Sequence, residues 1–244
     1  GQVNDGRLYR DLLASGIHDY LLKPLSANML RDSLTQAQAV FMAPKAGDDE
    51  GVKRHISTAV IGTRGGVGAS PLVTSLAWIF SAEKRMPTAL LDLDVHFGTG
   101  ALTLDLEPGR GLTDAIDNPS RIDGLFIERA MIRANDNLAV LSAEAPISAP
   151  LMTDGAAFVQ LEEEFRQAFE VTVIDLPRNM LINFPQLLAD VNIVTLVCEF
   201  TLASARDAIR ILSWLKTYAP HAQPLLVANK AKSGLAEISR ADFE

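Results

Sequence analysis

Cysteine, long apolar runs and excess positive charge are all scarce in this sequence, and each shortage excludes a class of protein. The single cysteine, Cys198, allows no disulfide within the chain, and with only four scattered histidines there is no Cys/His zinc site. No apolar run approaches the ~20 residues needed to span a bilayer, and no signal-peptide pattern is present, so we expect no membrane insertion. These absences predict a reducing, cytoplasmic setting. Cys198 lies in the apolar run 191–198 and is expected to be a small buried hydrophobe.

The charge balance is acidic. The net charge is −8 and the pI about 5.0, so the bulk surface repels nucleic acid and disfavours it as a partner. Hydrophobic residues make up 48% of the chain and charged residues 21%, as in a globular protein with a packed core.

Composition divides the chain into three parts. Residues 1–42 have a helix–strand–helix pattern that is too small to bury a core alone. Residues 43–55 are polar, contain glycine and proline, and read as a linker. Residues 56–244 are the main domain, which we expect to be truncated at its C-terminus.

Within the main domain, short apolar strands alternate with helical segments. This alternation predicts an α/β fold with a mostly parallel, doubly wound sheet covered by helices on both faces. The predicted strands are 56–62, 88–93, 138–141, 171–176, 191–198 and 224–228, and the clearest predicted helices are 71–80, 156–169 and 203–218.

A glycine-rich loop connects the first predicted strand to the first helix. It reads Thr-Arg-Gly-Gly-Val-Gly-Ala-Ser over residues 63–70, with glycines at 65, 66 and 68. Such a turn aims successive backbone N–H groups inward, and the helix N-terminus adds its positive dipole end. A phosphate chain is the natural occupant at this edge of the sheet. The alternative is a tight strand–helix turn that binds no ligand.

These residues resemble the deviant Walker A motif of ParA/MinD-type ATPases, whose pattern is Lys-Gly-Gly-X-Gly-Lys-Thr/Ser. The resemblance implies a P-loop NTPase fold that binds ATP or ADP and Mg²⁺. The nucleotide contacts it implies run through Arg64, Gly65, Gly66, Val67, Gly68, Ala69, Ser70 and Pro71. The Ser70 hydroxyl would be a magnesium ligand.

Two positions of the motif depart from the family. Arg64 replaces the signature lysine, which in the family reaches across a dimer, and Ala69 replaces the general phosphate-loop lysine. A charged hydrogen bond contributes roughly 1.5–3 kcal/mol, and loss of a transition-state donor slows a reaction by roughly 10²–10³. Nucleotide binding could therefore survive the loss of the lysine, whereas efficient turnover is not expected.

Acidic residues end two further predicted strands. Asp92 and Asp94 match the family's first switch, which makes Asp94 the candidate catalytic residue if the protein is active. Turn-forming aspartates are the alternative. Asp175 ends a strand that resembles Walker B and would hold magnesium directly or through water. Asn179 stands where the family has a glycine, which weakens the case for γ-phosphate sensing there.

Two later motifs also follow the family's order. Glu199-Phe200-Thr201 and then Arg206-Asp207-Ala208 resemble its dimer-interface segment, so Arg64 and Glu199 are candidate interface residues. The alternative is a helix cap at Thr201 or Ser204. Asn229 matches an asparagine that contacts adenine, with a strand-end turn as the alternative.

The loop sequence and the segment 104–115 are most similar to the CpaE/TadZ branch of this family, the ATPase-like proteins of Tad (Flp) pilus assembly. That branch carries a receiver-like domain first, and residues 16–25 resemble the last strand of a receiver, including its Lys-Pro pair. The resemblance implies a cytoplasmic homodimer recruited to the cell pole, with other pilus assembly proteins at the inner membrane or pole as partners. Three functions stay open: a scaffold or positional switch with weak or no hydrolysis, a slow ATPase, and a nucleotide-free interaction module.

Overall fold

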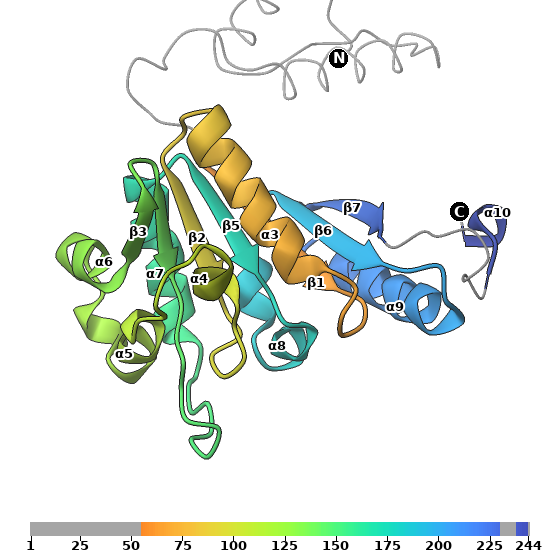
Figure 1. Ribbon diagram of the computed structural model, residues 1–244. Helices are drawn as coiled ribbons and strands as arrows, with labels where there is room; N and C mark the ends of the chain where they lie inside the picture. The colour runs from red at the N-terminus through yellow and green to blue at the C-terminus, as the bar shows by residue number, and fades with distance from the viewer. Residues whose placement is uncertain (1–54, 230–237, 244) are drawn as a thin grey trace, which may run out of the picture. The chain divides into compact units, whose positions relative to one another are not determined.

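The computed structural model describes residues 55–229 and 238–243, which fold around one seven-stranded sheet. The strand order is β3-β4-β2-β5-β1-β6-β7, and every neighbouring pair is parallel except β3–β4. The strands are β1 (Ile56–Gly62), β2 (Thr88–Asp92), β3 (Ile132–Asn135), β4 (Leu138–Leu141), β5 (Val171–Asp175), β6 (Ile193–Cys198) and β7 (Gln223–Ala228). Their parallel direction brings the carboxyl ends of β1, β2, β5 and β6 to the same edge (Figure 1).

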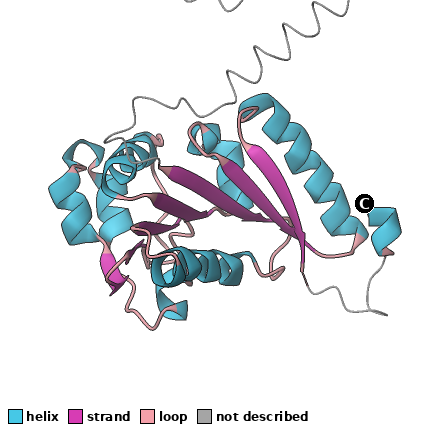
Figure 2. Cartoon of the chain, turned by 90° about the horizontal axis from the view of Figure 1, so that it is seen from above, coloured by secondary structure: helices cyan, strands magenta, loops and turns pink. Residues whose placement is uncertain are grey.

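Helices cover both faces of the sheet, as Figure 2 shows from above. The segments α3 (Ala69–Trp78) and α4 (Gly100–Thr103) lie on one face, and α7 (Ala156–Ala168) and α9 (Leu202–Tyr218) lie on the other (Figure 1). The remaining helices are short: α5 (Gly111–Asp117), α6 (Gly124–Ala130), α8 (Arg178–Asn183) and α10 (Arg240–Phe243). A π-helical turn, η1 (Ile79–Glu83), continues α3, and two 3₁₀ turns are η2 (Pro119–Arg121) and η3 (Pro185–Leu188).

Alternate residues of the central strands β1, β2, β4, β5 and β6 enter two separate cores. In β1, Ala59 and Ile61 belong to the larger core under α7 and α9, while Val60 belongs to the smaller core under α3. Because successive strand side chains point to opposite faces, a run of five buried residues in β1 requires cover on both sides. The amphipathic helix α7 supplies part of that cover with Phe158 and Phe165, both almost fully buried.

The predicted α/β class and the mostly parallel, doubly wound sheet are confirmed, and each predicted strand is present within two residues of its expected bounds. The prediction missed β3, which pairs antiparallel with β4 at the edge of the sheet. Its four residues, Ile-Arg-Ala-Asn, contain only two apolar side chains, too few for an alternation to be recognised. Cys198 is fully buried, as expected.

The predictions for residues 1–42, and for all of the 43–55 linker except His55, lie outside the described residues, as do residues 230–237 and 244 of the main domain. Across 55–229 and 238–243, none of the helices has the length and hydrophobicity required to span a membrane.

Glu162, a half-buried residue of α7, leads us to expect that the stability of the fold depends on pH. Burial, with a further contribution from the nearby Asp190 carboxylate, raises the pKa of Glu162 to about 8, and Glu162 Oε1 has no hydrogen-bond partner among the described residues. Between pH 4.5 and about 8, the folded state therefore keeps a proton that the unfolded state has already released. As a result, the free energy of unfolding falls as the pH rises through that window.

We expect the Glu162→Gln substitution to remove this pH-dependent loss of stability. Its Tm should exceed that of the wild type by several degrees at pH 8.5 and match it near pH 4.5, in thermal melts followed by circular dichroism. The exposed neighbour Glu163 provides the control, since Glu163→Gln should give the same small difference at both pH values. A Glu162→Gln effect that does not change with pH would contradict the assignment.

Candidate phosphate-binding site

The loop between β1 and α3 has the backbone of a phosphate cradle. Gly66 (φ +79°) and Gly68 (φ +97°) are both in the left-handed region, which L side chains rarely adopt. Gly68 directly precedes α3, so the loop opens onto the helix N-terminus. Pro71 lies in the first turn of α3, where no intrahelical N–H is needed. The turn signal in the sequence and the observed geometry therefore agree.

The loop forms one wall of a cleft of about 490 Å³. The residues predicted to contact nucleotide from Arg64 to Pro71 all line it, and so do Asp94 and Asp175 from the ends of two neighbouring strands. The cleft is additionally lined by Arg178 and Asn179 of α8. Segments far apart in the sequence thus meet at the carboxyl edge of the sheet, where ligands bind in open α/β folds.

Ser70 and Asp175 both line the cleft. A hydrogen bond from the Ser70 hydroxyl acts to lower the pKa of the Asp175 carboxyl. Burial, with smaller contributions from the carboxylates of Asp92 and Asp94, raises the pKa of Asp175 to about 6 despite that hydrogen bond. This hydroxyl–carboxylate pair is the donor set that the magnesium prediction requires. No group of three or more His, Cys, Asp or Glu side chains in the described ranges forms a complete metal site, so phosphate and water oxygens would have to complete the coordination.

Asp92 and Asp94 have different roles. Asp92 is 1% exposed and accepts hydrogen bonds from the backbone N–H groups of Asp94 (3.1 Å) and Gly100 (2.8 Å), which fixes the segment after β2. Burial raises the pKa of Asp92. Asp94 accepts from the Phe97 N–H (3.0 Å) and also faces the cleft. Both aspartates therefore form turns, and Asp94 alone of the two is placed to meet a ligand.

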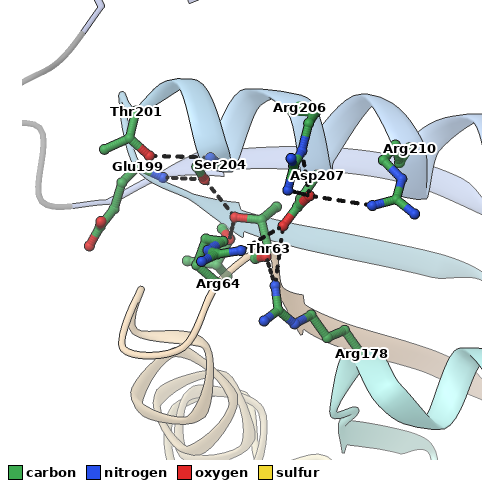
Figure 3. Close-up of polar contacts among 10 residues, drawn as sticks. Thr63, Arg64, Arg178, Glu199, Thr201, Ser204, Arg206, Asp207 and Arg210 are labelled. Carbon is green, nitrogen blue, oxygen red and sulfur yellow. Dashed lines mark hydrogen bonds and ion pairs between the residues drawn. The ribbon is translucent and has the colours of Figure 1, made fainter.

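Four arginines surround one buried carboxylate beside the loop (Figure 3). Asp207, in α9, has a side chain that is 11% exposed. Its Oδ2 accepts from Arg64 (3.1 Å) and Arg178 (3.3 Å), and its Oδ1 contacts Arg206 (3.1 Å) and Arg210 (3.8 Å). Burial opposes the charged carboxylate, but hydrogen bonds from Arg64 and Arg206 outweigh it and lower the pKa of Asp207.

This arginine cluster borders a second pocket of about 470 Å³, which shares Arg64, Arg178 and Asn179 with the cleft. Its apolar lining comes from α8 and α9 and includes Leu181, Ile211 and Trp214. The cleft and this pocket therefore adjoin, and Arg64, Arg178 and Asn179 line both of them.

Thr63, at the start of the loop, is hydrogen-bonded to β6 and α9. Thr63 is fully buried, its N–H donates to Val197 O (2.9 Å), and its hydroxyl lies 2.6 Å from that of Ser204. Thr201 caps α9 by accepting from the Ser204 N–H (3.2 Å), as the helix-cap alternative predicted. The Glu199 side chain points away from the arginine cluster in Figure 3.

Asn229 lies behind the loop. Its Nδ2 donates to Val67 O (2.8 Å), and a Cβ placed on Gly68 would lie 2.4 Å from the same nitrogen. Asn229 thus buttresses the loop backbone directly, a role that its position at a strand end did not reveal.

The sequence pattern alone did not single out Arg178 or Thr63, and it indicated Asp207 only as part of a motif. Arg178 directly follows the Asp-Leu-Pro segment, so its place at the edge of the sheet was a usable signal. The pairing of Arg64 and Arg178 with one carboxylate depends on tertiary contacts over 143 and 29 residues and has no local pattern.

The seven-stranded, mostly parallel sheet with a glycine loop after β1 is an α/β fold similar to that of ParA- and MinD-type proteins of known structure. A ParA family ATPase from Chlorobium tepidum has a TM-score of 0.67 at 16% identity, over 79% of each chain. The septum site-determining protein MinD from Pyrococcus horikoshii, in complex with Mg-ADP, has a TM-score of 0.59 at 16% identity, over 78% of this chain and 76% of that one.

The MinC:MinD cell division complex of Aquifex aeolicus contains a chain with a TM-score of 0.58 at 18% identity, covering 72% of this chain and 69% of that one. No protein-family model matches the sequence, and none of the curated proteins is similar enough to be called a relative. At these identities the likeness concerns the fold, so the activity must be argued from the site.

Proposed function

We propose that this protein binds ATP or ADP with Mg²⁺ in the loop cleft and works as a dimeric scaffold or positional switch with weak or no hydrolysis. One observation carries the proposal: Gly66 and Gly68 hold the loop in a phosphate-cradling conformation beside the Ser70–Asp175 pair, while Ala69 leaves the helix start without a lysine. A loop that served only as a turn would not need a hydroxyl–carboxylate pair at its open side.

Different residues of the cleft would bind the phosphates, the magnesium ion and a water molecule. Backbone N–H groups of the loop would contact the phosphates, and Ser70 and Asp175 would hold the magnesium ion. Bound magnesium would neutralise phosphate charge. Asp94 lines the same cleft, which supports a role in orienting a water molecule and slow hydrolysis as the second candidate function.

The scaffold part of the proposal extends beyond the nucleotide site. We place the protein in a cytoplasmic homodimer, with Arg64 and Glu199 at its interface, acting in Tad pilus assembly and recruited to the cell pole or inner membrane by other pilus proteins. The support is the similarity of the loop and of the segment 104–115 to the CpaE/TadZ branch. The acidic net charge of −8 supports a protein partner over DNA.

Calorimetric titration with ATP and with ADP tests the nucleotide part. We expect a Kd tighter than about 1 mM in the presence of Mg²⁺, and weaker binding after EDTA is added. Gly66→Asp is the matched control, because it strains the loop and puts a negative charge at the phosphates. Absence of binding at millimolar nucleotide would contradict the proposal. Phosphate release measured on the same samples separates the two candidates, since turnover abolished by Asp94→Ala would favour the slow ATPase.

A further inference from the structure

The cleft lacks the cation that a phosphate loop ordinarily places at the start of its helix, because residue 69 is alanine. Four charged side chains line it in the described part of the chain: Arg64, Arg178, Asp94 and Asp175. Without Arg178 the two carboxylates would face a single guanidinium, an unfavourable balance for an anion. The cleft therefore depends on α8 for half of its positive charge.

Arg178 is anchored at the base of the loop. It is the first residue of α8, three positions after the strand-end carboxylate Asp175. Its Nη1 donates to Thr63 O, immediately before Arg64, and to Asp207 Oδ2 at 3.3 Å. Figure 3 shows the guanidinium reaching from α8 to the loop. Two anchors on one nitrogen hold the plane of the guanidinium in place before any ligand arrives.

The remaining N–H groups of the Arg178 guanidinium are available to bind a ligand. Arginine has five N–H donors, and in the described part of the chain Nε and Nη2 of Arg178 donate to no protein atom. The side chain is 43% exposed and lines the cleft. A guanidinium binds phosphate through a rigid fork and keeps its charge at any physiological pH.

The neighbouring arginines are less well placed. Arg206 and Arg210 contact the opposite oxygen of Asp207 and line only the adjoining pocket. Arg64 does line the cleft, but among the described residues its guanidinium is anchored by Asp207 alone. Of the four arginines around Asp207, only Arg178 both lines the cleft and donates to two fixed acceptors.

We propose that Arg178 supplies the phosphate-binding charge that Ala69 lacks, so that the cation is provided by α8 and not by the loop. This inference rests on the proposed nucleotide binding. It assigns to Arg178 the recognition of the polyphosphate of the nucleotide, with no requirement that hydrolysis occur.

Calorimetric titration of the full chain with ATP and Mg²⁺, and separately with inorganic tripolyphosphate, tests the assignment. Arg178→Ala and Arg178→Gln should each weaken binding about 10- to 100-fold, the cost of one charged hydrogen bond. Arg178→Lys should recover most of the affinity. Arg210→Ala, which removes an arginine 3.8 Å from Asp207 and outside the cleft, should stay within about threefold of the wild type.

A double substitution distinguishes recognition from scaffolding. Ala69→Lys should restore binding to Arg178→Ala and should add less to the wild type, because the two cations serve the same phosphates. Melting temperatures of all variants identify any that are misfolded. Gln recovering as much as Lys would mean that Arg178 is only a clamp for Thr63, and would overturn the inference.

The failures of the two proposals are distinguishable. If the wild type binds neither ATP nor tripolyphosphate, the proposed function fails. If the wild type binds and Arg178→Ala binds equally well, the nucleotide site stands and the role of Arg178 is refuted.

Discussion

Replacing Gly68 with alanine is expected to abolish detectable nucleotide binding and to lower the Tm by several degrees. The residue has φ +97°, where an L side chain is strained, and its new Cβ would lie 2.4 Å from Asn229 Nδ2. Left-handed strain costs roughly 1–2 kcal/mol, and displacing Asn229 would also break its hydrogen bond to Val67 O. Both effects act on the loop backbone whose N–H groups form the phosphate cradle.

The other two loop glycines provide graded controls. A Cβ at Gly66 would meet no atom within 4 Å but would carry the strain of φ +79°, whereas a Cβ at Gly65 meets neither obstacle. Thermal melts of the three alanine variants should therefore rank Gly65→Ala as the mildest, Gly66→Ala as intermediate and Gly68→Ala as the most destabilised. A Gly68→Ala protein that melts like Gly65→Ala would contradict the role given to Asn229.

The chemistry of the loop could be predicted because it depends on local sequence. Gly66 and Gly68 must be glycine for their φ values, and Ser70 follows at a fixed spacing, so the pattern and the geometry correspond closely. The strands could be predicted because β1 and β5 are buried on both faces and read as continuous apolar runs.

The contacts behind the loop could not be predicted in the same way. Asn229 reaches Val67 across 162 residues, and Arg64 reaches Asp207 across 143. Such contacts depend on how β7 and α9 pack beside β1, and one sequence contains no local signal for them. The short edge strand β3 was missed for a different reason, since an alternation over only four residues is too short to be recognised.

The same distinction applies to Ala69. The motif shows which residue is missing from the loop, but only the folded chain shows which other cations face the cleft. Arg178 lies 109 positions from Ala69 by sequence number, and α8 brings it to the same cleft. A site of this kind can lose one charge from its motif and still retain a cation from a neighbouring element.

Among the described residues, replacing Asp207 with asparagine is expected to produce the largest electrostatic loss of stability. The substitution preserves shape but removes the one carboxylate shared by Arg64, Arg178, Arg206 and Arg210. Breaking a fully buried pair costs about 3–5 kcal/mol. These arginine side chains are 43–75% exposed, so solvent screening reduces the expected cost to about 2 kcal/mol. For a domain of this size, the Tm should fall by about 4–8 °C.

Salt and a matched control separate this repulsion from a general loss of packing. Raising the salt concentration to 1 M shortens the screening length to about 3 Å, so the Tm deficit of Asp207→Asn should shrink by about half or more. Asp114→Asn removes the carboxylate of the exposed Arg110–Asp114 pair at 3.8 Å and should cost less than about 1 kcal/mol at any salt concentration. If Asp207→Asn melts like Asp114→Asn, or if its deficit is independent of salt, the four arginines do not depend on Asp207 for neutralisation. The anchoring of Arg178 beside the loop would then rest on Thr63 alone.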